Sequence, residues 1–508
     1  MKLNRRYTLQ LLSSLFASSA LPVFANAESG SVKKRNQADD YRALVCLYLY
    51  GGNDSWNLLV PLSTEIDGSL KGRGYQTYKS RRADMAIEAN SLPLNVSISS
   101  AQQNPYFSPS LEQAYHKGVF PIEDSRWGLH GCAPELAQLY AENKLAWIAN
   151  TGVLPRRIRA SSLTQENKPA FLFAHNHQQH ALFTADASGN SRYGWAGMLA
   201  DVWKEHTDQG VLGLNLAIGK YAPFMAGQNT SPLVQPVGQP VAFSGMRKNK
   251  GDYELKFAND LMELNQLYRR ELFGLLFREK LGSAISLTHL LEEEWQHTSS
   301  FDGLFGPYGE ALFGSPDAKL VGLGTSISQH LTRQLETVTR LMEIGKRLGL
   351  KRQIFSVYLG GFDTHSAQAQ KHPLLIRNLS LSLWKFQKAL EHLGLDKQVV
   401  TFTQSDFGRT LQNNGDGTDH GWGGNQLVMG GSIASRVHGT MPDLREDSPD
   451  MFGDGRGRVI PSIAAEQVTA SLASWFGVED TLMPALFPNL PNFQTSDALS
   501  SSYLPLFK

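Results

Sequence analysis

The chain has 508 residues, of which 41% are hydrophobic and 19% charged, with 46 glycines and 23 prolines. This composition excludes a collagen-like and a wholly disordered protein, and it supplies enough apolar side chains for a large core. The formal net charge of +1, from 48 basic and 47 acidic residues, argues against a nucleic-acid binder that works through a field over the whole molecule.

The first 27 residues are predicted to be an export signal. Basic residues at positions 2, 5 and 6 precede a mildly apolar stretch, and residues 25–27 have the small-x-small pattern at which a signal peptidase cleaves. The pair Arg5-Arg6 resembles a twin-arginine signal, and the alternative is an ordinary Sec signal that contains two arginines. We therefore expect a periplasmic or secreted bacterial protein that depends on the twin-arginine or the Sec machinery.

The remaining chain is predicted to be one large domain. Cleavage after residue 27 removes three of the 48 basic residues and no acidic one, so 45 basic and 47 acidic residues remain, a formal charge of −2. Residues 28–40 are polar and are expected to form a flexible leader. Residues 41–508 then form a single α/β domain with an insertion around 205–320 and no permanent membrane span.

The first predicted elements of this domain are buried strands. Residues 43–50 are continuously apolar, which is typical of a central parallel strand, and Gly51-Gly52 ends the run. A helix is predicted near 134–142, followed by a strand at 145–149. The two cysteines, Cys46 and Cys132, allow at most one disulfide.

The second half of the chain alternates between helices and strands. Residues 215–250 are expected to form loops and short strands that cap the sheet. Helical spacing of apolar residues predicts helices over 253–281, 324–349 and 375–394, and buried strands are predicted at 353–359 and 398–403. This order indicates a large, mostly parallel sheet sandwiched by helices.

Polar clusters follow the predicted strands, at the edge where ligands bind in an open α/β sheet. The clusters begin at residues 51, 360 and 405, and a fourth lies at 418–424. The carboxylates and imidazoles that they would bring together are Asp54, Asp363, His365, Asp406, Asp419 and His420. Four carboxylates at close range need a cation, and mixed Asp and His ligands favour a divalent ion such as zinc or manganese. Each cluster alone would also fit a tight turn or a helix N-cap.

Further residues are candidates for contact with a substrate. Arg409 is suited to binding a phosphate or sulfate group as a bidentate fork. His175 is a candidate catalytic residue, and Asn53, His130 and His177 are candidate substrate contacts. For the histidines, simple packing is the alternative.

At these clusters the sequence resembles the DUF1501 family of exported bacterial proteins, whose function is largely unknown. The matching segments are residues 49–54, 129–136, 173–178, 194–197, 360–365, 405–410 and 419–421. The family looks like a branch of the alkaline phosphatase and sulfatase superfamily, which implies a large α/β sandwich with one or two divalent metals. In that likeness Asp54, Asp363, His365, Asp406 and His420 correspond to ligand positions.

Two departures from the superfamily pattern affect the expected activity. Phe407 stands where the superfamily has a histidine ligand after its Ser-Asp pair, so either one ligand is missing or His420 replaces it from the next loop. Ala174 stands where related proteins have a serine, so the nucleophile would be Thr151, Ser161, Ser162 or a water activated by the metal.

The resemblance implies a metal-dependent hydrolase of phosphate or sulfate esters, acting on a small-molecule or glycan ester. His175 and Arg409 would assist the reaction. The alternatives are a catalytically degenerate binding protein and a structural protein of the cell envelope with the same fold.

Overall fold

The computed structural model describes residues 40–64, 71–94, 110–165, 167–204, 213–240, 272–318, 323–496 and 498–508, with single positions between 256 and 263. The predicted export signal and nearly all of the leader lie outside the described residues, as do parts of the predicted insertion. Across the described ranges, no helix combines the length and the apolar character that a membrane crossing requires.

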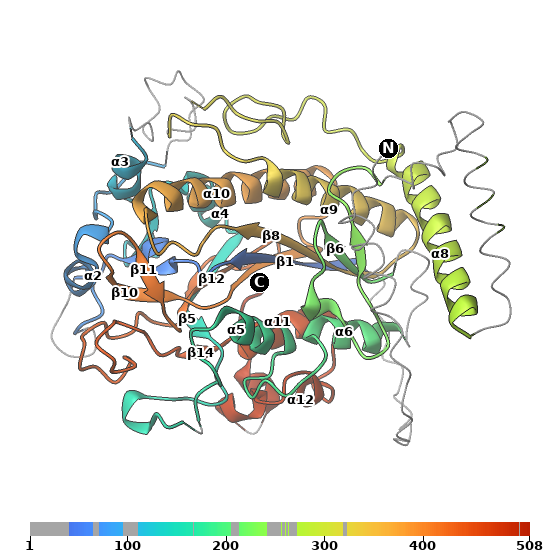
Figure 1. The fold of residues 1–508 in the computed structure, drawn as a ribbon. Helices are drawn as coiled ribbons and strands as arrows, with labels where there is room; N and C mark the ends of the chain where they lie inside the picture. The colour runs from blue at the N-terminus through green and yellow to red at the C-terminus, as the bar shows by residue number, and fades with distance from the viewer. Residues whose placement is uncertain are drawn as a thin grey trace.

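The described residues form a nine-stranded sheet at the centre of the molecule (Figure 1). Its order is β13-β5-β12-β9-β1-β8-β6-β7, with β14 paired to β5. The strands are β1 (Arg42–Tyr50), β5 (Leu145–Gly152), β6 (Asn215–Ile218), β7 (Leu233–Gln235), β8 (Arg352–Gly360), β9 (Val399–Ser405), β12 (Gly424–Met429), β13 (Val437–His438) and β14 (Ile463–Ala464). Only β12 runs antiparallel to its neighbours in this sheet, so the predicted mostly parallel α/β fold is confirmed.

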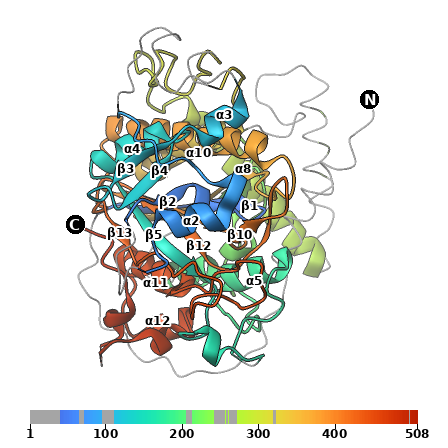
Figure 2. The same ribbon diagram turned by 90° about the vertical axis from the view of Figure 1, so that its left-hand side faces the viewer.

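Helices cover both faces of the sheet. Alternate side chains of the buried strand β1 point to opposite faces, so both faces are apolar and need a covering layer. Val45 and Leu47 pack in one core, and Leu44 and Cys46 in the other. One layer contains α4 (Pro134–Ala141), α9 (His330–Arg347) and α10 (Gln368–His392). The other contains α5 (His175–Thr184), α6 (Trp195–Lys204), α11 (Ala465–Phe476) and α12 (Met483–Leu486) (Figures 1 and 2). Cys132 packs in the layer opposite Cys46, and both thiols are free.

Smaller elements complete the described structure. A three-stranded sheet has the order β2 (Leu59–Pro61), β4 (Trp127–His130), β3 (Val119–Ile122), and a hairpin joins β10 (Arg409–Asn413) to β11 (Thr418–His420). The remaining helices are α2 (Tyr75–Arg82), α3 (Leu111–His116) and α8 (Leu272–Trp295). The helix predicted over 253–281 falls largely outside the described residues, and α8 begins inside its range. The strands β6 and β7 lie within the predicted insertion and are part of the main sheet.

The carboxyl ends of the parallel strands β1, β8 and β9 lie at one edge of the sheet. Tyr50 of β1 pairs with Gly360 of β8, and Leu49 pairs with Ser405 of β9. The chain can turn sharply after β1 because Gly51 has a φ of +115°. A Cβ atom on Gly51 would lie 2.3 Å from the backbone nitrogen of Asp363, so glycine is required for this close approach.

Candidate metal centre

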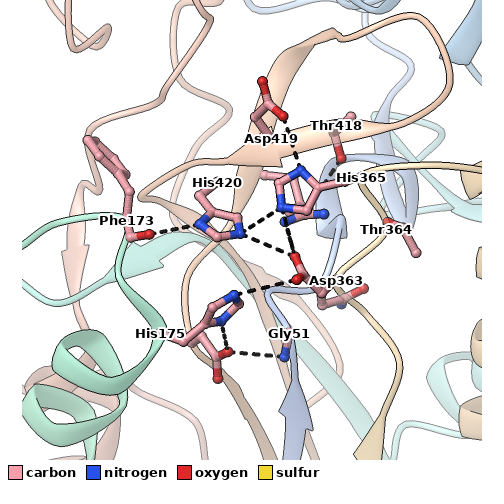
Figure 3. A network of polar contacts seen from close by, with 12 residues as sticks. Gly51, Phe173, His175, Asp363, Thr364, His365, Thr418, Asp419 and His420 are labelled. Atoms are coloured by element: carbon pink, nitrogen blue, oxygen red, sulfur yellow. Dashed lines mark hydrogen bonds and ion pairs between the residues drawn. The ribbon is translucent and has the colours of Figure 1, made fainter.

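Three histidines surround the carboxylate of Asp363 beyond the ends of β1 and β8 (Figure 3). The Nε2 atoms of His365 and His420 lie 3.1 and 3.2 Å from Oδ1 of Asp363. Nε2 of His175 lies 3.7 Å from Oδ2. His175 begins α5, His365 follows β8, and His420 ends β11, so three separate elements contribute the rings. Ligand atoms of His175, Asp363 and His420 all lie within 4.8 Å of one another.

The second nitrogen of each ring already faces an acceptor. Nδ1 of His175 lies 2.5 Å from Asp406 Oδ2, and Nδ1 of His365 lies 3.1 Å from Asp419 Oδ1. Nδ1 of His420 lies 2.7 Å from the carbonyl oxygen of Phe173. Carbonyl and carboxylate oxygens only accept, so Nδ1 is the donor in each contact, and a ring that carries its proton there alone presents the lone pair of Nε2 to the centre. This arrangement is the one that metal-binding histidines adopt.

The charges of the centre favour a cation. Nε2 of His365 and Nε2 of His420 are only 2.9 Å apart, next to a carboxylate. Two lone pairs cannot face each other at this distance unless a proton or a metal ion lies between them. A set of three imidazole nitrogens and one carboxylate oxygen suits zinc, manganese or iron better than calcium or magnesium. The residues present therefore fit a divalent transition-metal ion.

The protonation states agree with this role. Burial would raise the pKa of Asp363, but the Arg409 guanidinium and the hydrogen bond to His420 hold that pKa below its usual value. Burial lowers the pKa of His420, although its contacts with Phe173 and Asp363 oppose the shift. The carboxylate is thus kept ionised and the imidazole neutral, which are the forms that bind metal.

Arg409 forms an ion pair with Asp363 and has no exposed surface. Its Nη1 donates to Asp363 Oδ1 at 3.0 Å, and its Nε donates to Thr418 Oγ1 at 3.3 Å. The prediction that Arg409 binds a phosphate or sulfate group as a fork does not agree with this position, because the buried guanidinium is enclosed by the protein. Arg409 instead offsets the charge of Asp363.

Two of the predicted ligands contact the outer nitrogens of the histidines and not the central carboxylate. Asp406 is 2% exposed, and besides His175 it accepts hydrogen bonds from Tyr48 Oη, the Gly51 amide and Gln179 Nε2. Asp419 accepts from His365 and from Asn414 Nδ2. Both carboxylates orient histidine rings by holding their Nδ1 atoms.

Asp54 points away from the centre. It is fully buried, forms an ion pair with Arg82 of α2, and accepts a hydrogen bond from Gln368 of α10. The chain turns inward after Gly51 into a short 3-10 helix, Ser55–Asn57, whose residues are all buried. The prediction that Asp54 is a metal ligand is corrected accordingly: its charge is neutralised inside the core.

The predicted substrate contacts are also dispersed. The side chain of Asn53 is buried and its Oδ1 lies 3.1 Å from His372 Nε2. His130 is buried, and its Nδ1 accepts from the amide of Cys132. The ring of His177 is exposed and stacks on Phe171 at 4.2 Å between centroids. None of these three side chains contacts the four central groups in the described structure.

None of the three hydroxyl residues predicted as nucleophiles is hydrogen-bonded to the central groups in the described structure. Thr151 is buried in β5, and Ser161 and Ser162 lie in a 3-10 turn where Ser162 Oγ donates to the carbonyl of Arg159. Among the described residues, no Ser, Thr or Tyr hydroxyl is hydrogen-bonded to Asp363 or to any of the three Nε2 atoms.

Sequence reasoning missed several residues that build the site. The carbonyl of Phe173, the hydroxyl of Tyr48 and the partners of Asp54 depend on contacts between distant segments, and no local pattern marks them. Gln179 lies in the same histidine-rich stretch as His175, which is the one signal that could have indicated it.

Comparison with known proteins supports the family resemblance. The model of a family described as "Protein of unknown function (DUF1501)" matches residues 338–452. This segment contains Asp363, His365, Asp406, Arg409 and the Asp419-His420 pair, while His175 lies outside it. No curated protein matches the chain.

One solved structure with a similar outline is described as "Ps i-CgsB in complex with k-i-k-neocarrahexaose". It has 11% sequence identity and a TM-score of 0.29, with 71% of this chain and 72% of that chain covered. At this TM-score the likeness says nothing about the chemistry of the site.

Proposed function

We propose that this chain is an exported, metal-dependent hydrolase of phosphate or sulfate esters, with zinc or manganese as the expected ion. The observation that carries this proposal is the approach of three imidazole Nε2 atoms to the carboxylate of Asp363. His175, His365, His420 and Asp363 would hold the ion. The segment matched by the family model contains three of these four residues, and His175 lies outside it.

The residues around the centre have separate roles in the proposed reaction. A bound divalent ion would supply Lewis-acid activation of the ester and of an attacking water. Asp406 and Asp419 keep His175 and His365 in the tautomer that presents Nε2 inward. Arg409 stabilises the ionised form of Asp363. Because no hydroxyl among the described residues is hydrogen-bonded to the central groups, water is the expected nucleophile.

A second candidate function is a metal-loaded binding protein without turnover. Ala174, directly before His175, carries no hydroxyl where related proteins have a serine. Such a protein would bind phosphate or sulfate at the same centre without hydrolysing their esters.

The primary experiment measures the metal content of the purified mature chain after loading with zinc or manganese. We expect roughly one bound equivalent, and a loss of at least ten-fold in affinity for His175→Ala. His177→Ala is the matched control, because His177 lies on the same helix but stacks on Phe171. A wild-type chain that retains no transition metal would overturn the proposal.

Activity is then tested on aryl phosphate, phosphodiester and aryl sulfate substrates. We expect turnover by the metal-loaded chain and a loss of at least a hundred-fold for Asp363→Ala. Unchanged turnover in Asp363→Ala would show that catalysis occurs elsewhere. A loaded chain that binds phosphate or sulfate but hydrolyses no ester would favour the second candidate function.

A further inference from the structure

A glycine-rich loop, residues 452–458, lies against the hairpin that carries His420. The amide of Leu411 in β10 donates to the carbonyl of Gly457 at 2.8 Å. Gly457 has a φ of +70°, and a Cβ atom there would lie 2.9 Å from the side chain of Leu411. The loop is therefore fixed closely on the hairpin.

Arg458 ties this loop to the backbone of His420 and to Phe173, the residue that accepts from the His420 ring. Its Nε donates to the carbonyl of His420 at 2.8 Å, and its guanidinium lies 3.8 Å above the ring of Phe173. The carbonyl of Phe173 is the acceptor of His420 Nδ1. An ion pair of 2.6 Å between Arg458 Nη1 and Asp454 closes the loop on itself. The position of the loop is thus coupled to that of the metal centre.

Arg456 projects from this anchored loop to the rim of the centre. Its side chain is 61% exposed, and its Nη1 lies 3.9 Å from Oδ2 of Asp419. The other oxygen of Asp419 holds His365. The guanidinium of Arg456 is therefore accessible from solvent, yet only one carboxylate away from a proposed metal ligand.

Two other arginines near the site also pair with carboxylates, and both are buried. Arg82 pairs with Asp54, and Arg409 pairs with Asp363, and all four groups except Asp363 are fully buried. A phosphate or sulfate ester carries negative charge on its non-bridging oxygens, so its binding needs an accessible cation besides the metal. Arg456 offers an exposed planar fork of donors next to Asp419.

We propose that Arg456 binds the non-bridging oxygens of the phosphate or sulfate group and thereby selects anionic esters. This inference rests on the proposed function and assigns to Arg456 the contact that the buried Arg409 cannot make. In this role Arg456 determines substrate specificity, and its removal should leave the metal ligands in place.

The test compares metal-loaded wild type, Arg456→Ala and Arg456→Lys in steady-state kinetics and in inhibition by inorganic phosphate and sulfate. We expect Arg456→Ala to raise KM and the inhibition constants by about ten-fold or more, with metal content unchanged, and Arg456→Lys to recover part of the loss. Arg126→Ala is the matched control, because Arg126 is 60% exposed, pairs with Glu123 and lies on the β3–β4 hairpin.

Three outcomes would overturn the inference. If Arg456→Ala has the same KM and inhibition constants as an active wild type, only the role of Arg456 is refuted. Loss of bound metal in Arg456→Ala would show that the residue acts through Asp419 rather than on the substrate. A wild-type chain that loads metal but neither binds these anions nor hydrolyses their esters refutes the proposed function together with the inference.

Discussion

Side chains from four different segments contact the carboxylate of Asp363. Arg409 comes from β10, His420 from β11, His365 from the loop after β8, and His175 from the start of α5. The side chain of Asp363 is still 45% exposed, so the centre is open to solvent on one side. A partly open centre of this kind can admit a substrate, whereas a closed structural metal site cannot.

Unlike Asp363, Asp54 is fully buried and neutralises the charge of Arg82 inside the core. We expect Asp54→Asn to lower the free energy of unfolding by about 3–5 kcal/mol, because Arg82 would be left buried without a counter-charge. Metal affinity should change little, since Asp54 contacts none of the four central groups. Denaturant unfolding and metal titration of the same variant check both parts. A loss of metal affinity as large as that expected for His175→Ala would restore Asp54 as a ligand.

At the scale of elements, the end of β9 decides the architecture of the site. The chain leaves the sheet there, forms the β10–β11 hairpin and returns as β12, antiparallel to β9. This excursion places Arg409 and His420 above the ends of β1 and β8. The antiparallel strand therefore follows from a connection that starts and finishes at the same edge of the sheet.

The turn after β1 is tested by Gly51→Ala. An added Cβ would collide with the backbone of Asp363, so we expect a lower melting temperature together with at least a ten-fold loss of metal affinity. Gly189→Ala is the control, because Gly189 also has a positive φ of +72° but no atom lies within 4 Å of its added Cβ. It should lose about 1–2 kcal/mol of stability and no metal affinity. Equal metal affinities in the two variants would contradict the proposed dependence of the site on this approach.

At the scale of the whole molecule, metal binding should stabilise the fold, because the ligands come from segments between residues 175 and 420. A free metal concentration of a hundred times the dissociation constant adds about 2.7 kcal/mol to the free energy of unfolding. We therefore expect thermal unfolding of the loaded wild type to shift upward by a few degrees relative to the chelated protein. The same comparison with His420→Ala should show no shift, and an equal shift there would place the metal elsewhere.

Global stability should also depend on Glu466, in the first turn of α11. Glu466 is 5% exposed, and burial raises its pKa to about 8 despite hydrogen bonds from Asn489. Since the folded-state pKa lies above the unfolded one, the unfolded chain ionises first as the pH rises. This group's contribution to stability is therefore retained below about pH 4.5 and falls between about pH 4.5 and 8, by roughly 1.4 kcal/mol per pH unit.

The measurement compares melting temperatures of wild type and Glu466→Gln from pH 5 to pH 8. The glutamine cannot ionise, so the difference should move steadily in favour of the variant as the pH rises, whatever its sign at pH 5. Glu112→Gln is the control, because Glu112 lies in the first turn of α3 but is exposed. Parallel pH curves for wild type and Glu466→Gln would contradict the raised pKa.

The sequence by itself determined the sheet and the edge at which the site lies. Continuous apolar runs ending in Gly51-Gly52 and Gly360-Gly361 fix where β1 and β8 stop, and parallel pairing brings those ends together. For this reason Asp363, His365 and His420 could be placed in one cluster from their positions in the chain. The antiparallel direction of β12 could not be predicted, because it depends on the path of a hairpin rather than on the local pattern.

Only the tertiary structure decided which way each polar side chain points and which charges are paired. Asp54 follows a strand end just as Asp363 does, yet Arg82 from α2 draws it into the core. Arg409 is buried because Asp363 and Thr418 enclose its guanidinium, while Arg456, which no pattern marked, remains exposed at the rim. The physical reason is that spacing along the chain fixes a residue's position on the sheet edge, whereas side-chain pairing depends on partners tens or hundreds of residues away.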